Sequence, residues 1–220
     1  MDYISQTAVL LVGLLPALLA GFLITLAVAS AAMPLAILFG LLLLAPRMGA
    51  PVVAVPTVGF IELMRSTPLL LQIYLVYFGL PLLGLYPSEL TCGIAGIAAQ
   101  HGAFLAETYR GAIESISRTQ WDAARGIGMS RFKVFRHVVL PQALMKIPGP
   151  LANQLIVLVK DTSLVSAIGV AELTMTGKMA IERSAASAEV FVAVALFYLV
   201  LTTALGGVFR LVEHRTAGRH

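Results

Sequence analysis

The sequence Asp122-Ala-Ala-Arg-Gly-Ile-Gly128 lies in the one long polar segment of an otherwise apolar chain, and Val138-Val-Leu-Pro141 follows it at a short distance. Thr119 precedes the acidic residue by three positions, which is the spacing of a capping box, and the two alanines favour a helix. Gly128 supplies the backbone freedom for a turn out of that helix. The stretch therefore predicts one short helix that ends in a tight turn.

A second short helix is predicted between Ser130 and Pro141. Ser130 is a suitable N-cap, Phe132 and Phe135 recur at helical spacing, and proline ends the helix. The basic residues take the other face: Arg131, Lys133, Arg136 and His137. Two short helices around a glycine give a compact knob with small residues, including Ala123 and Ala124, at its tip, which suits close contact with a partner protein. The alternative is an amphipathic connector that lies on the membrane surface.

The composition is that of a polytopic membrane protein surrounded by lipid. Hydrophobic residues make up 59% of the 220 residues, charged residues make up 12%, and the mean hydropathy is +0.91. In soluble domains about a quarter of the residues are charged. Roughly 20 apolar residues per crossing allow about half a dozen spans at most. The net charge of +4 does not indicate nucleic-acid binding, because the basic residues lie in loops between apolar segments.

The apolar segments predict an all-α membrane protein with about five transmembrane helices. The first apolar run is too long for one crossing, so we expect a separate interfacial helix over residues 8–20, with Gly21 beginning the first span and Pro34 bending it. The spans are expected at about 21–45, 67–83, 90–109, 151–173 and 190–212. This division gives an interfacial segment 1–20, a transmembrane domain 21–212 with a polar loop at about 110–150, and a tail 213–220.

The basic residues predict the orientation of the chain. In the five-span arrangement the Lys and Arg residues of the loops and tail fall on one side, except Lys178 and Arg183. The positive-inside rule therefore places the N-terminus outside, and the polar loop and the C-terminus in the cytoplasm. The outer loops are short, so a separate protein is expected to capture any substrate before transport.

Two adjacent charges lie inside the fourth predicted span. Lys160 and Asp161 are about ten residues into it, roughly 15 Å deep at about 1.5 Å per residue. Each charge facing lipid there costs about 2.5 to 3.5 kcal/mol. Neighbouring residues on a regular helix do not face each other, so we expect a break in the helix, with Thr162 and Ser163 satisfying the freed backbone groups. Two interpretations of this charged pair stay open. In the first, the two residues line a translocation path or gate. In the second, they form a structural pair held by neighbouring helices or a second subunit.

Other polar residues of the spans give weaker signals. Gln100 and His101 occupy the middle of the third span, where a path role and a packing role are equally open. Glu107 lies near its cytoplasmic end and can pair with Arg110 at helical spacing. Cys92 is the single cysteine, which excludes an intramolecular disulfide and indicates a buried small residue. The four histidines have no metal-ligand spacing, so no metal or cofactor is expected.

The polar loop resembles the cytoplasmic "EAA" loop of ABC-importer permeases, with Asp122 where that family usually has glutamate. Further segments resemble the polar amino-acid subfamily, namely residues 64–72, 106–116, 153–156, 160–164 and 170–173. The resemblance implies a type I importer permease fold in the bacterial cytoplasmic (inner) membrane. It implies a docking site for the ATPase at Asp122, Ala123, Ala124, Gly128, Leu140 and Pro141. The implied partners are ABC ATPase subunits, a second permease that is identical or homologous, an extracytoplasmic substrate-binding protein and an amino-acid substrate.

The chain is predicted to transport and not to catalyse. It contains no Gly-x-x-x-x-Gly-Lys-Ser/Thr phosphate loop, so ATP is expected to bind to a partner. The leading hypothesis is a permease whose translocation path includes Gln100, His101, Lys160, Asp161 and Ser163. The alternatives are a secondary transporter or channel, which inverted repeats would favour, and a membrane scaffold. The sequence does not select the amino acid, nor decide between identical and different permease subunits.

Overall fold

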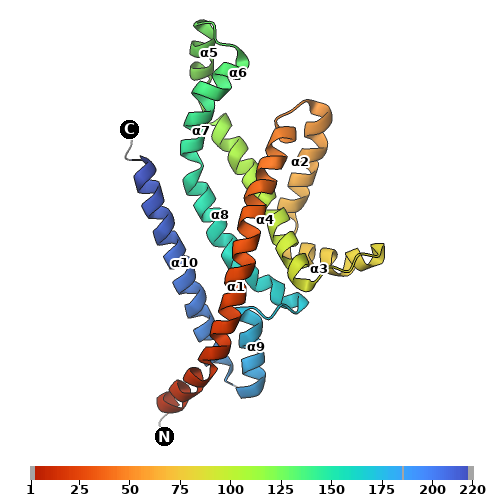
Figure 1. Ribbon diagram of the computed structural model, residues 1–220, viewed down its shortest axis with the longest axis vertical. Helices are drawn as coiled ribbons and strands as arrows, with labels where there is room; N and C mark the ends of the chain where they lie inside the picture. Colours follow the sequence, from red (N-terminus) through yellow and green to blue (C-terminus); the bar gives the residue numbers. More distant parts are fainter. Residues whose placement is uncertain (1–2, 185, 218–220) are drawn as a thin grey trace. The chain divides into compact units, whose positions relative to one another are not determined.

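The structure is a computed structural model that describes residues 3–184 and 186–217, and within these residues it is helical with short connections (Figure 1). The first elements are α1 (Tyr3–Arg47), α2 (Pro51–Ser66), α3 (Leu69–Gly79), η1 (Leu80–Leu83) and α4 (Glu89–Glu114). The polar loop forms α5 (Arg118–Gly126), α6 (Arg131–Val134), the π-helical turn η2 (Phe135–Val139) and α7 (Leu140–Lys146). The last elements are α8 (Pro148–Asp161), the 3-10 helix η3 (Thr162–Ile168), α9 (Leu173–Ser184) and α10 (Ser187–Ala217).

The helices form two compact units. The first unit comprises Met1–Leu35, Thr67–Ala98 and Ile156–Leu205. The second comprises Ala36–Ser66, Ala99–Leu155 and Gly206–His220. The long helices α1, α4, α8 and α10 each contribute to both units, whereas the whole polar loop belongs to the second.

Helix α1 is continuous from Tyr3 to Arg47, so the prediction of a separate helix that ends before Gly21 is wrong. Gly21 serves packing and does not interrupt the helix. A Cβ atom at this position would lie 2.5 Å from Oγ1 of Thr176 and 3.1 Å from Cα of Leu173, so only glycine allows α9 to approach α1 this closely. The 45 residues of α1 span about 67 Å, roughly twice the thickness of a bilayer core. The interfacial position of segment 1–20 stays a prediction, and its residues 1–2 lie outside the described part of the chain.

The first unit is held together by a buried carboxylate at the start of α9. Glu172 is fully buried and accepts hydrogen bonds from the Met175 amide (2.9 Å), the Tyr198 hydroxyl (2.8 Å) and the Thr25 hydroxyl (3.3 Å). The Thr25 hydroxyl oxygen in turn accepts a hydrogen bond from the Leu173 amide at 3.2 Å. Glu172 and Thr25 of α1 thus satisfy two amide donors at the N-terminus of α9, which helix geometry alone leaves without partners. Tyr198 of α10 donates to the carboxylate itself.

The second unit contains a close crossing of α1 and α4. A Cβ atom at Gly40 would lie 2.9 Å from the carbonyl oxygen of Gly102, and one at Gly102 would lie 2.7 Å from the ring of Phe39. Small residues at both positions therefore let the two backbones approach, as is common between helices in membranes. Nearby, Arg65 of α2 lies over the ring of Phe104 at 5.3 Å.

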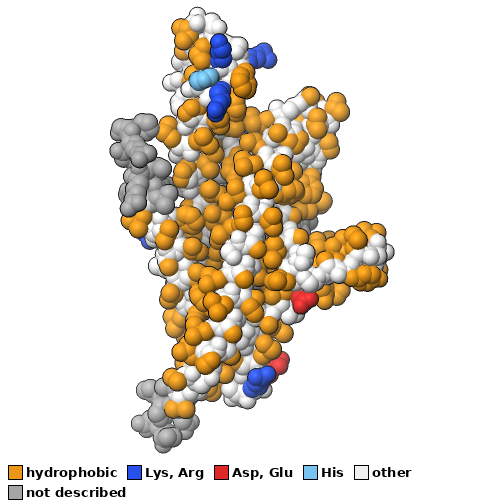
Figure 2. Space-filling view, in the orientation of Figure 1, with side chains coloured by type: hydrophobic (Ala, Val, Ile, Leu, Met, Phe, Trp, Pro, Cys, Tyr) orange, Lys and Arg blue, Asp and Glu red, His pale blue; other side chains and the backbone are white. Residues whose placement is uncertain are grey.

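Three stretches of the described residues are long and apolar enough to cross a membrane: Val9–Arg47, Pro148–Ile168 and Ser187–Leu211. Helices α2 and α3 pass the same test as a pair separated by a bend. The bend occurs at Thr67 and Pro68, because proline has no amide hydrogen and disfavours helical geometry in the residue before it. Figure 2 shows hydrophobic side chains over α1 and α3, and Lys and Arg side chains over α5 and α6.

Candidate docking hairpin and polar sites of the helices

The polar loop forms a hairpin of two helices, as predicted. Helix α5 begins after Ser117, two residues earlier than the predicted cap at Thr119, so the proposed capping box is wrong. Gly128 has a φ of +82°, the left-handed conformation that the predicted turn requires. The side chain of Ser130 accepts a hydrogen bond from the Lys133 amide at 3.5 Å, which confirms the predicted cap of the second helix.

Pro141 does not end the second helix, contrary to the prediction. The helical run continues without interruption from Arg131 through α6, η2 and α7 to Lys146. The π-helical turn η2 ends at Val139, two residues before the proline, and its wider backbone accommodates a residue that would clash inside a regular α-helix. The Gln142 side chain donates to the Val138 carbonyl at 2.7 Å beside this irregular turn.

The hairpin has its own apolar core, and this core includes one of the two predicted tip alanines. Ala124 is buried, whereas Ala123 is exposed. The buried core residues are Ala112, Ile113, Ile116, Ala124, Val134, Val139 and Ala143, and Trp121 packs against them. The prediction that both alanines lie at a contact surface is therefore wrong for Ala124, since α5 turns that side toward α4 and η2.

The remaining predicted docking residues lie mostly on the surface of the hairpin. Asp122, Gly128 and Pro141 are exposed, and Leu140 is half-buried. The exposed side of the turn also carries two large apolar side chains, Ile127, which the sequence reasoning did not single out, and Phe132, which it placed on the apolar face of the second helix. Ile127 is 80% exposed and Phe132 is 73% exposed. Exposed aromatic and aliphatic side chains beside a glycine turn fit a surface that a partner covers.

An ion-pair network lies in α4 just before the hairpin. Arg110 Nη2 is 2.7 Å from Glu107 Oε2, which confirms the predicted pair, and Arg110 also pairs with Glu114. Arg47 Nε donates to the other oxygen of Glu107 at 2.9 Å. No sequence pattern pointed to Arg47, because it lies 60 residues from Glu107, at the end of α1. The network links α1 to the segment of α4 that leads into the hairpin.

Gln100 and His101 each contact a neighbouring helix of the second unit. Gln100 Nε2 donates to the Met64 carbonyl of α2 at 3.1 Å. His101 is 1% exposed, and its Nδ1 lies 2.7 Å from Nε2 of Gln154 in α8. Because the amide nitrogen is a donor, this geometry assigns the acceptor role to Nδ1. These contacts give both residues a packing role, and their part in a path stays a prediction.

The predicted break at the charged pair is confirmed. Helix α8 ends at Asp161, and the 3-10 helix η3 begins at Thr162. The buried Thr162 hydroxyl donates to the Val159 carbonyl at 2.7 Å, as expected for a break in the backbone ladder. The Lys160 side chain is exposed in the single chain, while Asp161 and Ser163 are half-buried. Lys160, Asp161 and Ser163 belong to the first unit, whereas Gln100 and His101 belong to the second. A role in the translocation path stays a prediction for all five residues.

Other sequence predictions concern cysteine and metal binding. Cys92 is buried at 1% exposure, as predicted. Among the described residues, no group of three or more His, Cys, Asp and Glu side chains is placed to hold a metal ion. Sequence reasoning quoted Glu172 only as part of a resemblance and missed its buried contacts. No local signal marks it, because glutamate is not among the residues preferred at an N-cap.

Comparison with known proteins gives the class of this protein. The family described as "binding-protein-dependent transport system inner membrane component" matches residues 32–218. The glutamine transport system permease protein GlnP of Escherichia coli (strain K12) is 40% identical over 158 residues, which cover 71% of this chain and 72% of that protein. The L-cystine transport system permease protein TcyL of Bacillus subtilis (strain 168) is 32% identical over 208 residues, covering 91% and 87%.

A solved structure has the same fold over nearly the whole chain. It is described as an amino acid ABC transporter with histidines, and it is 30% identical with a TM-score of 0.89 over 98% of this chain and 99% of that one. The chain belongs to the family of inner membrane components of binding-protein-dependent transport systems. It is therefore a permease subunit of an ABC transporter, in which the ATPase is a separate subunit.

Proposed function

We propose that this permease forms the translocation path of an ATP-driven importer for polar amino acids. The observation that supports this most strongly is the α5–α6 hairpin, with its left-handed Gly128 turn, in a chain whose relatives are permeases for glutamine and cystine. The partners are ABC ATPase subunits, a second permease, and an extracytoplasmic binding protein that delivers the amino acid. The chain crosses the membrane about five times, with its N-terminus outside and its C-terminus in the cytoplasm.

The hairpin is connected to the membrane helices in a way that suits transmission of force. Helices α6, η2 and α7 form one uninterrupted run, and Lys146 at its end donates to the Ser115 hydroxyl (2.9 Å) and carbonyl (3.1 Å) beyond α4. Movement of a docked ATPase would therefore act on α4 and α7 together. Closure of the two ATPases on binding ATP would then alternate access to the path.

Copurification tests the proposal. A tagged chain extracted in mild detergent should bring down a subunit with a phosphate loop, and the complex should hydrolyse ATP. In proteoliposomes with the binding protein, uptake of labelled glutamine or cystine should require ATP inside. Uptake driven by an ion gradient in vesicles without the ATPase would instead identify a secondary transporter and contradict the proposal.

The orientation is tested by two single cysteines in a Cys92→Ala background. Ser130 and Ser88 form a matched pair because both are exposed, and each accepts a backbone hydrogen bond at a helix start, from Lys133 and Thr91 respectively. We expect a membrane-impermeant thiol reagent on intact spheroplasts to label Ser88→Cys but label Ser130→Cys only after permeabilisation. Labelling of Ser130→Cys from outside would reverse the orientation.

A further inference from the structure

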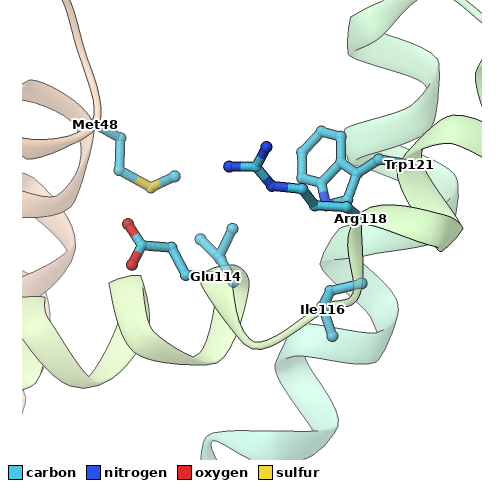
Figure 3. A pocket seen from close by; sticks show the side chains of 6 residues that line it. Met48, Glu114, Ile116, Arg118 and Trp121 are labelled. Atoms are coloured by element: carbon cyan, nitrogen blue, oxygen red, sulfur yellow. The ribbon is translucent and has the colours of Figure 1, made fainter.

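Two adjacent hollows lie beside α5 and share Arg118 and Trp121. The larger has a volume of about 440 Å³, and Figure 3 shows Arg118 and Trp121 on one side of it, with Met48 and Glu114 on the other. The smaller has a volume of about 390 Å³ and extends along α5 to Asp122 and Arg125. We call the two together the α5 groove. It belongs to the second unit, and its apolar lining is continuous with the hairpin core, because Ile113 and Ile116 are core residues and Trp121 packs against them.

The cations of the hairpin have no counterion among the side chains that the structure describes. The hairpin carries five Lys and Arg residues and one acid: Arg118, Arg125, Arg131, Lys133, Arg136 and Asp122. None of the described ion pairs includes any of them. In the adjacent α4 network, by contrast, Glu107 and Glu114 neutralise Arg110. The hairpin therefore carries an excess of positive charge, and Arg118 and Arg125 line the groove together with the carboxylates of Asp122 and Glu114.

The groove combines this charge with apolar walls. Trp121 is half-buried, Met48 is 45% exposed, and Ile113 and Ile116 form the floor beneath them. A guanidinium presents a planar fork of donors that matches a carboxylate, and an indole wall suits an aliphatic or aromatic side chain. The complementary occupant is an acidic side chain next to an apolar one.

A folded protein fits this groove better than a lipid surface does. Helix α5 turns its apolar side, including Ala124, into the hairpin core, and its outer side carries polar residues such as Thr119 and Gln120. A helix that lies in a membrane interface has the opposite arrangement, with its apolar side outward. The hollows are also concave, and a flat layer of headgroups does not fill them.

We propose that the α5 groove receives an acidic-apolar segment of the ATPase subunit, with a carboxylate on Arg118 and Arg125 and an apolar side chain against Trp121. This inference rests on the proposed function, since it defines the chemistry of the ATPase surface that the permease recognises. In this arrangement each protein inserts a part of itself into the other. The hairpin tip at Ile127 enters the ATPase, and the groove behind the tip accepts part of the ATPase.

Charge reversal in purified components tests the inference. Arg118→Glu and Arg125→Glu are compared with Lys133→Glu, which makes the same charge change on the same hairpin at an exposed residue that lines neither hollow. The dissociation constant of the ATPase from the detergent-solubilised permease is measured at low and high salt. We expect the groove variants to bind at least about tenfold more weakly at low salt, and Lys133→Glu to change binding less than about threefold. High salt should shrink these differences.

A cross-link identifies the carboxylate. The Arg118→Lys variant keeps the charge and adds an amine that a carbodiimide joins directly to a contacting carboxylate. We expect a product with the ATPase that the wild-type permease does not give, mapped to an Asp or Glu beside an apolar residue. Unchanged binding by both groove variants, or an equal loss with Lys133→Glu, would overturn the groove contact. A loss seen only when anionic lipid vesicles are present would assign the groove to lipid headgroups. Failure of the wild-type permease to bind any ATPase would refute the proposed function itself.

Discussion

A tryptophan in place of Gly126 is expected to abolish uptake while the permease still folds and inserts. Gly126 is an exposed residue at the end of α5, and a Cβ atom there meets nothing within 4 Å, so the larger side chain projects from the hairpin without disturbing it. Bulk at the centre of an interface separates the two surfaces. We expect ATPase affinity to fall at least about 30-fold, equivalent to the roughly 2 kcal/mol typical of central interface residues.

The position of the substitution matters for this experiment. Tryptophan at Gly128 would strain a backbone with a φ of +82°, and tryptophan at Ala124 would disrupt the buried core of the hairpin. Either change would lower activity whether or not the hairpin docks. Gly13→Trp is the matched control, because Gly13 is also an exposed helical glycine with nothing within 4 Å of a Cβ atom, and it lies in α1. Normal ATPase association by Gly126→Trp would remove the tip from the interface.

The hairpin was predictable because its determinants are local. The turn at Gly128 and the cap at Ser130 both depend on residues within a few positions, and both are confirmed. The wrong predictions in the same segment concern positions where tertiary packing or an irregular backbone determines the structure. Ala124 has the same intrinsic preference as Ala123, and only the contacts of α5 with α4 and η2 make one of them a core residue. The π-helical turn before Pro141 has no simple sequence signal.

Long-range contacts explain the other differences. The sequence predicts a boundary between two helices at Gly21 because glycine weakens helices, whereas its neighbour Thr176, more than 150 residues away, explains why glycine stands there. Arg47 and Glu172 were missed for the same reason, since their partners lie on other helices. The break after Asp161 was predictable from local geometry, because two charges that are adjacent in sequence do not face each other on a regular helix.

Asp161→Asn is expected to reduce import by at least about tenfold while the complex still assembles. The substitution preserves the size of the side chain and removes its charge. Lys160, the adjacent cation, is exposed in the single chain, so loss of the carboxylate does not leave a cation buried within the subunit's own core. That observation favours a charge that faces a polar path over the alternative of a buried structural pair. For such a pair, loss of one partner costs about 3 to 5 kcal/mol and would appear as a low yield of complex.

Thr162→Val is the matched control for a structural effect at the same break. The Thr162 hydroxyl is buried and donates to the Val159 carbonyl at 2.7 Å, so valine removes one hydrogen bond, about 1 kcal/mol, with no change of charge. We expect this variant to lower the yield of complex moderately and to keep normal uptake per complex. Uptake in proteoliposomes, divided by the amount of intact complex recovered, separates the two kinds of effect. If Asp161→Asn behaves like Thr162→Val, with a reduced yield and normal uptake per complex, Asp161 stabilises the end of α8 and does not line the path.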